Sequence, residues 1–184
     1  MSARATSSRG VSPPAGVART RGVPAWAQGA CVAARRAIHT QRARWPVICP
    51  QVRPAGPVRV GFVGDGPYGD VNAGYGFDAA SPDLGPGTNG GHWTLQVAPK
   101  ALLVSSVSRA GRPASQTTTI AGRPVTIYRI RGYDQGGGYY ADHVVVEWVG
   151  RKAGCQTSVH GYAHRQLAVR MMRAIIQQCA KGLG

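Results

Sequence analysis

His143-Val-Val-Val-Glu-Trp-Val149 is the strongest strand pattern in this chain, and the turn Gly150–Gly154 separates it from Cys155-Gln-Thr-Ser-Val-His-Gly-Tyr162. Side chains alternate between the two faces of a strand, so three apolar residues ending with Trp148 share one face of the first run. The other face carries His143 and Glu147. Two such runs around a glycine-bounded turn predict an antiparallel hairpin.

The hairpin is followed by a segment with helical periodicity. Its apolar residues recur at spacings of three and four, which predicts one buried stripe on a helix over about residues 163–180. The stripe consists of Ala168, Met171, Met172, Ile175, Ile176 and Cys179. Arg165, Arg170 and Arg173 fall on the opposite side, so we expect this helix to cover one face of a sheet.

Upstream of the hairpin, short β-rich runs alternate with Gly and Pro. We expect strands over 58–63, 73–77, 92–97, 101–107, 117–120 and 124–130. The runs 92–97 and 101–107 are expected to pair, and 121–123 is expected to form a tight turn. The predicted fold class is therefore α+β: an antiparallel sheet of six or seven strands with one C-terminal helix packed on one face.

The chain length of 184 residues accommodates one domain. Residues 1–45 are rich in Arg, Ser and Pro, and Trp26 is the only aromatic residue before Trp45, so we predict a disordered tail or a mis-assigned start. Residues 46–184 are predicted to form the single globular domain. The tail lacks the apolar stretch of a recognisable secretory signal, and no run is long enough to predict a transmembrane helix.

The chain is strongly basic, with 22 Lys and Arg against 7 Asp and Glu and a formal net charge of +15. Eight of these cations are arginines in residues 1–50, which contain no acid. The excess of Arg over Lys, together with the Ala, Gly and Pro content, is typical of a GC-rich genome. A cytoplasmic protein associated with nucleic acid is the alternative hypothesis, and its support is the net charge.

The C-terminal part of the chain resembles a group of known domains. Gly122-x-Pro124-Val-x-x-Tyr128, the run 143–148, Thr157-Ser-Val-His-Gly161 and a helix with Met171 and Ile175 carry the resemblance. The pattern is similar to small extracytoplasmic domains of unknown function in actinobacterial lipoproteins and anti-sigma-type membrane proteins. The resemblance covers about residues 120–180. It implies an exported or secreted, non-catalytic module that binds a protein or cell-envelope partner.

Two patterns that could bind a cofactor or a metal are not expected to do so. Gly64-Asp-Gly66-Pro-Tyr-Gly69 has dinucleotide-motif spacing, but no helix follows it to hold a phosphate, so we predict no cofactor. His160 and His164 are separated by Gly161, which breaks the helical placement that would make them converge. His143 and Glu147 share a strand face about 13 Å apart, so we also predict no metal site.

Catalysis is not expected either. Ser158 and His160 share one strand face, but adjacency along a strand does not aim a base at a hydroxyl group, so a hydrolase is a minor hypothesis. A ligand groove is the more interesting candidate, because exposed aromatic side chains near glycine-rich loops can stack on sugars, bases or peptides. The groove candidates are Tyr68, Tyr75, Trp93, Tyr139 and Tyr140.

Four cysteines offer a second constraint. They include no C-x-x-C pair, so a zinc ribbon or thioredoxin-type site is excluded. In an oxidising compartment Cys155 with Cys179 would link the last strand to the helix, and Cys31 with Cys49 would attach the tail to the domain. Cys49 with Cys179 is the rival pairing, and the sequence leaves the connectivity open.

Overall fold

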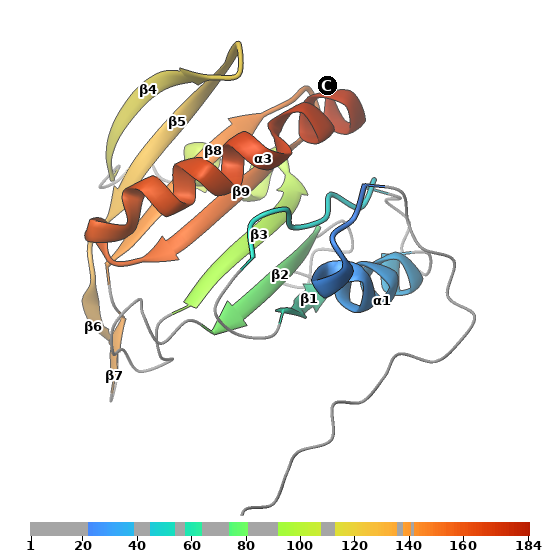
Figure 1. Cartoon of the computed structure of the whole chain (residues 1–184). Coiled ribbons are helices and arrows are strands. Elements are labelled where there is room, and N and C mark those ends of the chain that lie inside the picture. The colour runs from blue at the N-terminus through green and yellow to red at the C-terminus, as the bar shows by residue number, and fades with distance from the viewer. Residues whose placement is uncertain are drawn as a thin grey trace, which may run out of the picture.

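A computed structural model of the chain describes residues 22–38, 45–53, 58–63, 74–80, 92–107, 113–135, 138–140 and 142–184. Seven antiparallel strands form its sheet in the order β1-β2-β3-β9-β8-β5-β4, and α3 (Arg165–Leu183) lies across one face (Figure 1). The predicted fold class is therefore confirmed. The strands are β1 (Val58–Val63), β2 (Tyr75–Ala80), β3 (His92–Pro99), β4 (Ala114–Ile120), β5 (Arg123–Ile130), β8 (His143–Val149) and β9 (Ala153–His160). A separate pair is formed by β6 (Tyr133–Gln135) and β7 (Gly138–Tyr140).

The β8–β9 hairpin forms at the predicted place. Trp148 lies opposite Cys155, and the Gly150 N–H donates to the Ala153 carbonyl at 2.9 Å, which closes the turn. Gly150 is required there, because a Cβ atom on it would lie 2.4 Å from the Leu183 carbonyl oxygen at the end of α3. The hairpin turn and the helix end therefore pack backbone to backbone.

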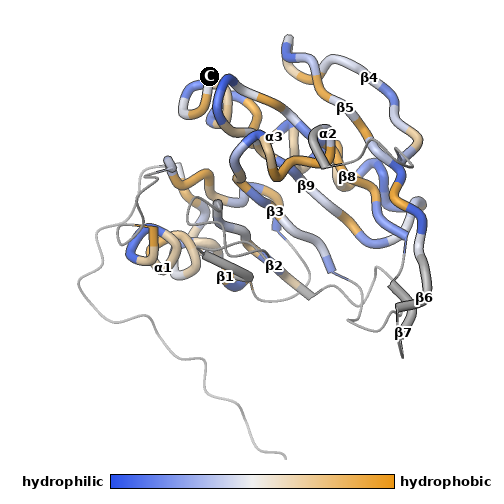
Figure 2. The backbone as a smooth tube through the Cα atoms, turned by 180° about the vertical axis from the view of Figure 1, so that it is seen from behind, coloured by the Kyte–Doolittle hydropathy of each residue, from blue (hydrophilic) through white to orange (hydrophobic). Residues whose placement is uncertain are grey.

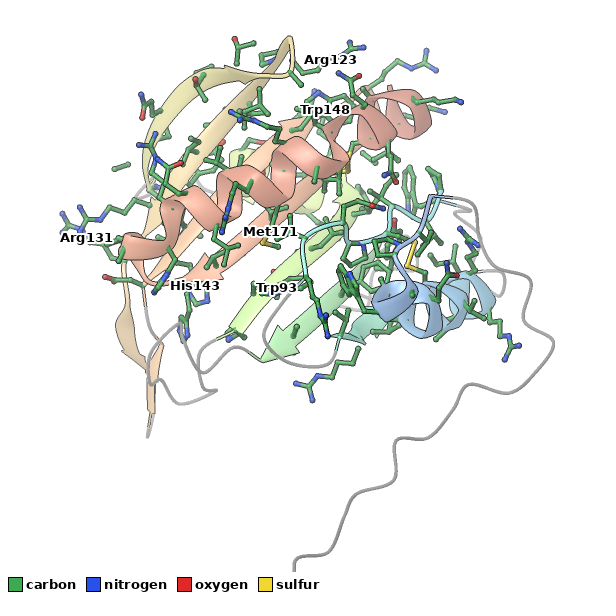
Figure 3. All side chains as sticks on the ribbon, viewed as in Figure 1. Trp93, Arg123, Arg131, His143, Trp148 and Met171 are labelled. Carbon is green, nitrogen blue, oxygen red and sulfur yellow. A yellow bond between two sulfur atoms is a disulfide. The ribbon has the colours of Figure 1, made fainter. Side chains whose placement is uncertain are left out.

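The apolar stripe of α3 faces the sheet as predicted. Its residues from Ala168 to Cys179 are buried, and Figure 3 shows Met171 on the side of the helix that faces the strands. Hydrophobic and hydrophilic segments alternate along the helix (Figure 2). No helix in the described ranges combines the length and hydropathy needed to cross a membrane.

Two further contacts attach α3 to β9. A disulfide joins Cys155 to Cys179, and the Thr157 hydroxyl donates to the Ala168 carbonyl at 2.9 Å. The second disulfide joins Cys31 to Cys49, so the first of the pairings considered from the sequence is confirmed.

The β4–β5 hairpin also forms as predicted, around a two-residue turn. Ala121 and Gly122 have φ values of 48° and 77°, the left-handed conformations that suit tight hairpins. Pro124 follows at a position that does not donate to β4, because the pairs flanking a two-residue turn alternate in their hydrogen bonding. The missing proline N–H therefore costs the β4–β5 ladder nothing.

The expected strand over 101–107 is wrong. These residues form a 3-10 turn, η3 (Lys100–Leu102), and a short helix, α2 (Val104–Val107). The Lys100 N–H donates to the Lys152 carbonyl at 2.9 Å, which turns the chain out of the sheet after Pro99. The expected partner of β3 is also wrong, because β3 pairs with β2 and β9.

The predicted boundary at residue 46 is wrong as well. Residues 25–38 form η1 (Ala25–Ala27) and α1 (Gln28–Ile38), and α1 packs against β1 and β2 (Figure 1). The buried residues of this segment are Ala27, Cys31, Ala34 and Ile38, which recur at helical spacing. Small side chains and a disulfide thus hold a segment whose composition suggested disorder. Residues 1–21 and 39–44 of the predicted tail lie outside the described ranges.

Candidate metal centre

Three histidines lie side by side at the ends of three neighbouring strands of the sheet. His92 is the first residue of β3, His143 is the first of β8, and His160 is the last of β9. His143 lies directly opposite His160, and the register that pairs Trp93 with Val159 places His92 opposite His160 from the other side. Three neighbouring strands therefore present one imidazole each at the same level.

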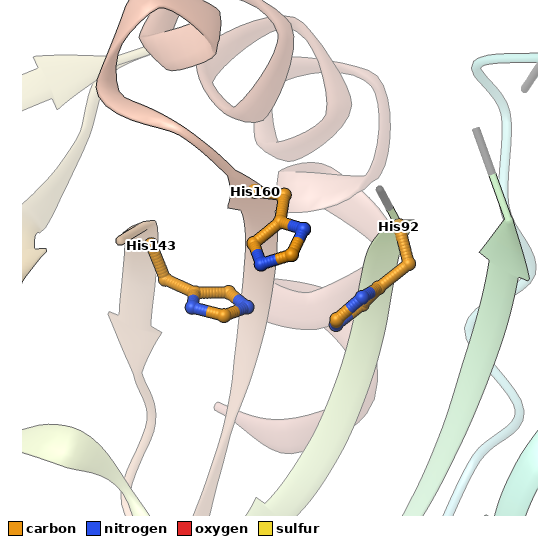
Figure 4. Close-up of side chains that lie close together, drawn as sticks. All are labelled: His92, His143 and His160. Atoms are coloured by element: carbon orange, nitrogen blue, oxygen red, sulfur yellow. The ribbon is translucent and has the colours of Figure 1, made fainter. Parts of the chain in front are cut away.

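The three imidazoles lie on the face of the sheet that α3 leaves uncovered. Cys155 and Thr157 of β9 contact α3, so the alternate residue His160 faces the other way. His143 and His92 follow His160 because directly paired residues share a face. Figure 4 shows the three rings turned toward one another from their separate strands.

The distances between the rings are short. The ring centroids of His143 and His160 are 4.6 Å apart, those of His92 and His160 are 4.8 Å apart, and those of His92 and His143 are 5.4 Å apart. One nitrogen from each ring can be chosen so that all three lie within 4.8 Å of one another. His143 and His160 are each only 3% exposed, whereas His92 is half-buried.

This geometry is close to that of three ligands on one transition-metal ion. Zinc–imidazole bonds are about 2.0–2.1 Å long, so two nitrogens on one tetrahedral zinc lie roughly 3.4 Å apart. The nitrogens lie within 4.8 Å of one another, so they would have to approach by at most about 1.4 Å to share one zinc ion. A three-histidine set suits zinc, copper or nickel, and it leaves a fourth coordination position open.

The backbone next to His143 and His160 is held by specific contacts. Gly161 ends β9 with a φ of +79°, and its N–H donates to the Asp142 carbonyl at 2.7 Å. The Asp142 carboxylate accepts from the Gly132 N–H at 2.6 Å. These bonds fix where β8 begins and where β9 ends. They therefore also fix the backbone positions from which the imidazoles of His143 and His160 extend.

The other residues considered for a metal site do not join this group. His164 lies beyond Gly161 in the short turn η4 (Tyr162–His164) and is not one of the three that converge. Glu147 is buried in a separate polar cluster, where its carboxylate accepts from Gln156 Nε2 at 2.6 Å and from the Ser105 N–H at 3.4 Å. Burial, and after it the negative charge of Glu147, raise the pKa of Tyr128 in the same cluster.

The predicted aromatic groove is wrong for the two candidates whose side chains are described. Tyr75 and Trp93 are at most 2% exposed and belong to the core. The Tyr75 hydroxyl accepts from the Ile48 N–H and donates to the Pro46 carbonyl at 2.8 Å, and its ring packs edge-on against Phe77. Tyr68 lies outside the described ranges, as does the G-x-G-x-x-G segment over 64–69, and the side chains of Tyr139 and Tyr140 are not described.

A groove exists elsewhere, between the first half of β4, β5 and the start of α3. Its volume is about 340 Å³. Its lining residues are Ala114, Ser115, Gln116, Ile127, Tyr128, Arg129, Val144, Tyr162 and Arg165. The Arg129 guanidinium stacks over the Tyr162 ring at 3.6 Å, and Arg165 donates to Gln116 Oε1 at 2.8 Å.

Sequence reasoning missed His92. The alternation around Trp93 and Leu95 places this histidine on the opposite face of its strand, but only the β3–β9 register reveals that it meets His160. Glu147, on the same strand as His143, belongs to the separate polar cluster with Gln156 and Ser105. The ligand set forms across strands instead.

No family model, curated protein or solved structure matches this chain. No enzyme family is found among these comparisons, and the resemblance to extracytoplasmic domains stays a prediction. Function is therefore inferred from the geometry of the three histidines.

Proposed function

We propose that this chain is an exported, disulfide-stabilised binding domain, and that it binds a divalent transition-metal ion through His92, His143 and His160. The single observation that carries the proposal is the convergence of three imidazoles from three neighbouring strands to within 4.8 Å. Histidine is the commonest metal ligand among side chains, and a strand framework fixes ligand positions more firmly than loops do.

Binding accounts for the site better than catalysis does. Glu147 is the carboxylate on this face of β8, and Gln156 and Ser105 already bond to it. Ser158 lies two residues before His160 on the same strand, a separation of roughly 6.6 Å. We therefore assign the three histidines to holding an ion, with a solvent molecule or a partner's ligand at the fourth position.

Substitution of single histidines tests metal binding. Zinc affinity is measured by competition with a chromophoric chelator for the unaltered chain, His92→Gln and His160→Gln. Removing even an outer-shell partner of a metal ligand costs about 10- to 100-fold in affinity, so each direct-ligand variant is expected to lose roughly a hundredfold or more. His164→Asn is the matched control, because His164 lies just beyond Gly161 and outside the converging set.

Measuring the free energy of unfolding with and without zinc distinguishes the loss of a metal ligand from misfolding of the variant. Zinc at a hundred times its dissociation constant is expected to raise the free energy of unfolding by about 2.7 kcal/mol. This gain should disappear in His92→Gln, whose metal-free stability is expected to stay close to that of the parent because His92 is half-buried. Equal zinc affinity in the parent and both histidine variants would refute the site.

Export is supported by the two disulfides, since such bonds persist in oxidising compartments. Intact mass spectrometry of the protein from fractionated native cells tests it, with alkylation before and after reduction. We expect all four cysteines to become alkylated only after reduction, in the envelope or medium fraction. Four thiols that alkylate without reduction in the cytosol would contradict export and favour the nucleic-acid hypothesis.

A further inference from the structure

β4, the outermost strand next to β5, has the features of an edge to which another strand can bind. β4 pairs with β5, no other described strand pairs with its outer edge, and residues 114–117 are exposed. Its sequence Ala-Ser-Gln-Thr-Thr-Thr-Ile contains no charge and no proline, and its register with β5 has no bulge. At the opposite end, β1 carries a register shift between Val60 and Phe62. Proteins normally protect exposed edges with such devices, and β4 has none of them.

The hairpin turn determines which backbone groups β4 presents. Ile120 and Arg123 flank a two-residue turn, so they form a hydrogen-bonded pair, and every second pair along the ladder does the same. The residues between these pairs direct their N–H and C=O groups outward. Ser115, Thr117 and Thr119 therefore offer a row of donors and acceptors to an added strand.

The groove described above lies next to this edge. Arg165 bonds to Gln116 and Gln177 bonds to the Ala121 carbonyl, so α3 runs alongside β4 in the same direction. Ala114 is paired with Arg129 in the β4–β5 register. Because the side chain of Ala114 is only a methyl group, it leaves Arg129 accessible from the outer edge of β4. The side chains of Ile127, Val144 and Tyr162 add an apolar lining.

The charge of this region favours an acidic occupant. The elements β4, β5 and α3 contain no Asp or Glu, whereas Arg129 and Arg165 line the groove. The one ion pair among the described residues, Arg59 with Asp78, is at the other end of the sheet. A second copy of the chain would bring the same arginines to the edge, so like charges oppose a β4–β4 dimer.

We propose that the outer edge of β4 binds an extended acidic segment of a partner protein by strand addition. Backbone groups of Ser115, Thr117 and Thr119 pair with the segment, as in other complexes formed by strand addition. A Glu side chain of the segment enters the groove toward Arg165 and Arg129. This surface is separate from the three histidines, so it does not depend on metal binding.

Backbone amide NMR of the full chain tests the proposal with a defined probe. The probe is an acetylated eight-residue peptide of alternating Val and Glu, and the comparison peptide carries Gln in place of Glu. We expect the Glu peptide to shift the amide signals of Ser115, Thr117 and Thr119 and to bind about tenfold more tightly than the Gln peptide.

Two variants separate the backbone contribution from the charge. Thr117→Pro removes an outward N–H without removing a β4–β5 hydrogen bond, and we expect affinity for the Glu peptide to fall about five- to tenfold. Thr117→Ala is the matched control and should bind like the parent. Arg165→Gln should abolish the preference for Glu over Gln.

Three results would overturn the proposal. The first is an absence of shifts along β4 at millimolar peptide. The second is equal binding of the Glu and Gln peptides, which would remove the acidic specificity. The third is a dimer in sedimentation velocity that Thr117→Pro dissociates, which would assign the edge to a second copy of the chain.

Discussion

Each of the three histidines occupies an ordinary position in its own strand. Alternation along the chain predicted the face of His143 and of His160, and the short β8–β9 turn sets their pairing, so this half of the site is a local property. His92 belongs to a distant segment, and its place beside His160 depends on the non-local pairing of β3 with β9. Spacing arguments along one strand could not reveal a ligand set that forms across three.

Tyr75 is a residue whose single hydroxyl group supports a non-local contact. It accepts from the Ile48 N–H and donates to the Pro46 carbonyl, which attaches residues 46–48 to β2. Tyr75→Phe leaves the buried N–H without its partner, so we expect the free energy of unfolding to fall by about 1–3 kcal/mol in urea titrations. Tyr162→Phe is the control, because the buried Tyr162 hydroxyl has no hydrogen-bond partner among the described residues. Equal losses in both variants would contradict this role.

The same tyrosine predicts how stability depends on pH. Burial raises the pKa of Tyr75 far above its ordinary value of 10.0. The unfolded chain therefore releases this proton near pH 10 while the folded chain retains it, so stability is full below pH 10 and falls as the pH rises beyond it. Between pH 10 and 11, the free energy of unfolding should fall less steeply with pH in Tyr75→Phe than in the parent. The two slopes should differ by up to one proton, which is about 1.4 kcal/mol per pH unit. Identical slopes for the parent and variant would contradict the burial of the phenol.

At the scale of elements, the position of α3 depends on its attachment to β9. The stripe from Ala168 to Cys179 was evident in the sequence because its spacing is helical, and the hairpin before it is local. The direction of the helix across the sheet is set by contacts that spacing does not encode. These are the Cys155–Cys179 disulfide and the bond from Thr157 to the Ala168 carbonyl.

Removing this disulfide should loosen α3. The bond closes a loop with a sequence separation of 24 residues, so Cys155→Ser with Cys179→Ser is expected to lower stability by about 3 kcal/mol. Hydrogen exchange should show faster exchange throughout α3. The matched pair Cys31→Ser with Cys49→Ser should speed exchange in α1 and leave α3 protected. Faster α3 exchange in the second pair, or unchanged α3 exchange in the first, would contradict these separate roles.

The sequence did not predict helix α1, because the composition of this segment makes its helical pattern weak. Of its three buried residues, Cys31 and Ala34 are small and bury little area each, and the segment lies among arginines and serines typical of disorder. The spacing of Ala27, Cys31, Ala34 and Ile38 is helical, and this pattern could have indicated the helix. Nothing local indicates that the helix packs against β1 and β2.

For the whole molecule, the sequence predicted the fold class and the approximate position of most strands, but it placed a false strand over 101–107 and did not predict the strand order. The β4–β5 and β8–β9 hairpins follow from tight turns, so both were predictable. The central β3–β9 contact and the β5–β8 contact join segments separated by other elements, and alternation alone does not select these partners. The strand order makes β3, β9 and β8 neighbours, so the three histidines at their ends come together. The same order leaves β4 as an outer strand of the sheet.

X-ray absorption spectroscopy of the zinc-loaded full chain tests the central claim most directly. The account predicts one zinc per chain with three imidazole nitrogens at about 2.0–2.1 Å and an oxygen of a solvent molecule as the fourth ligand. It also predicts that the imidazole contribution falls from three to two in His92→Gln. A zinc bound by carboxylates or thiolates, or a spectrum that His92→Gln does not alter, would contradict a metal centre built from these three strands.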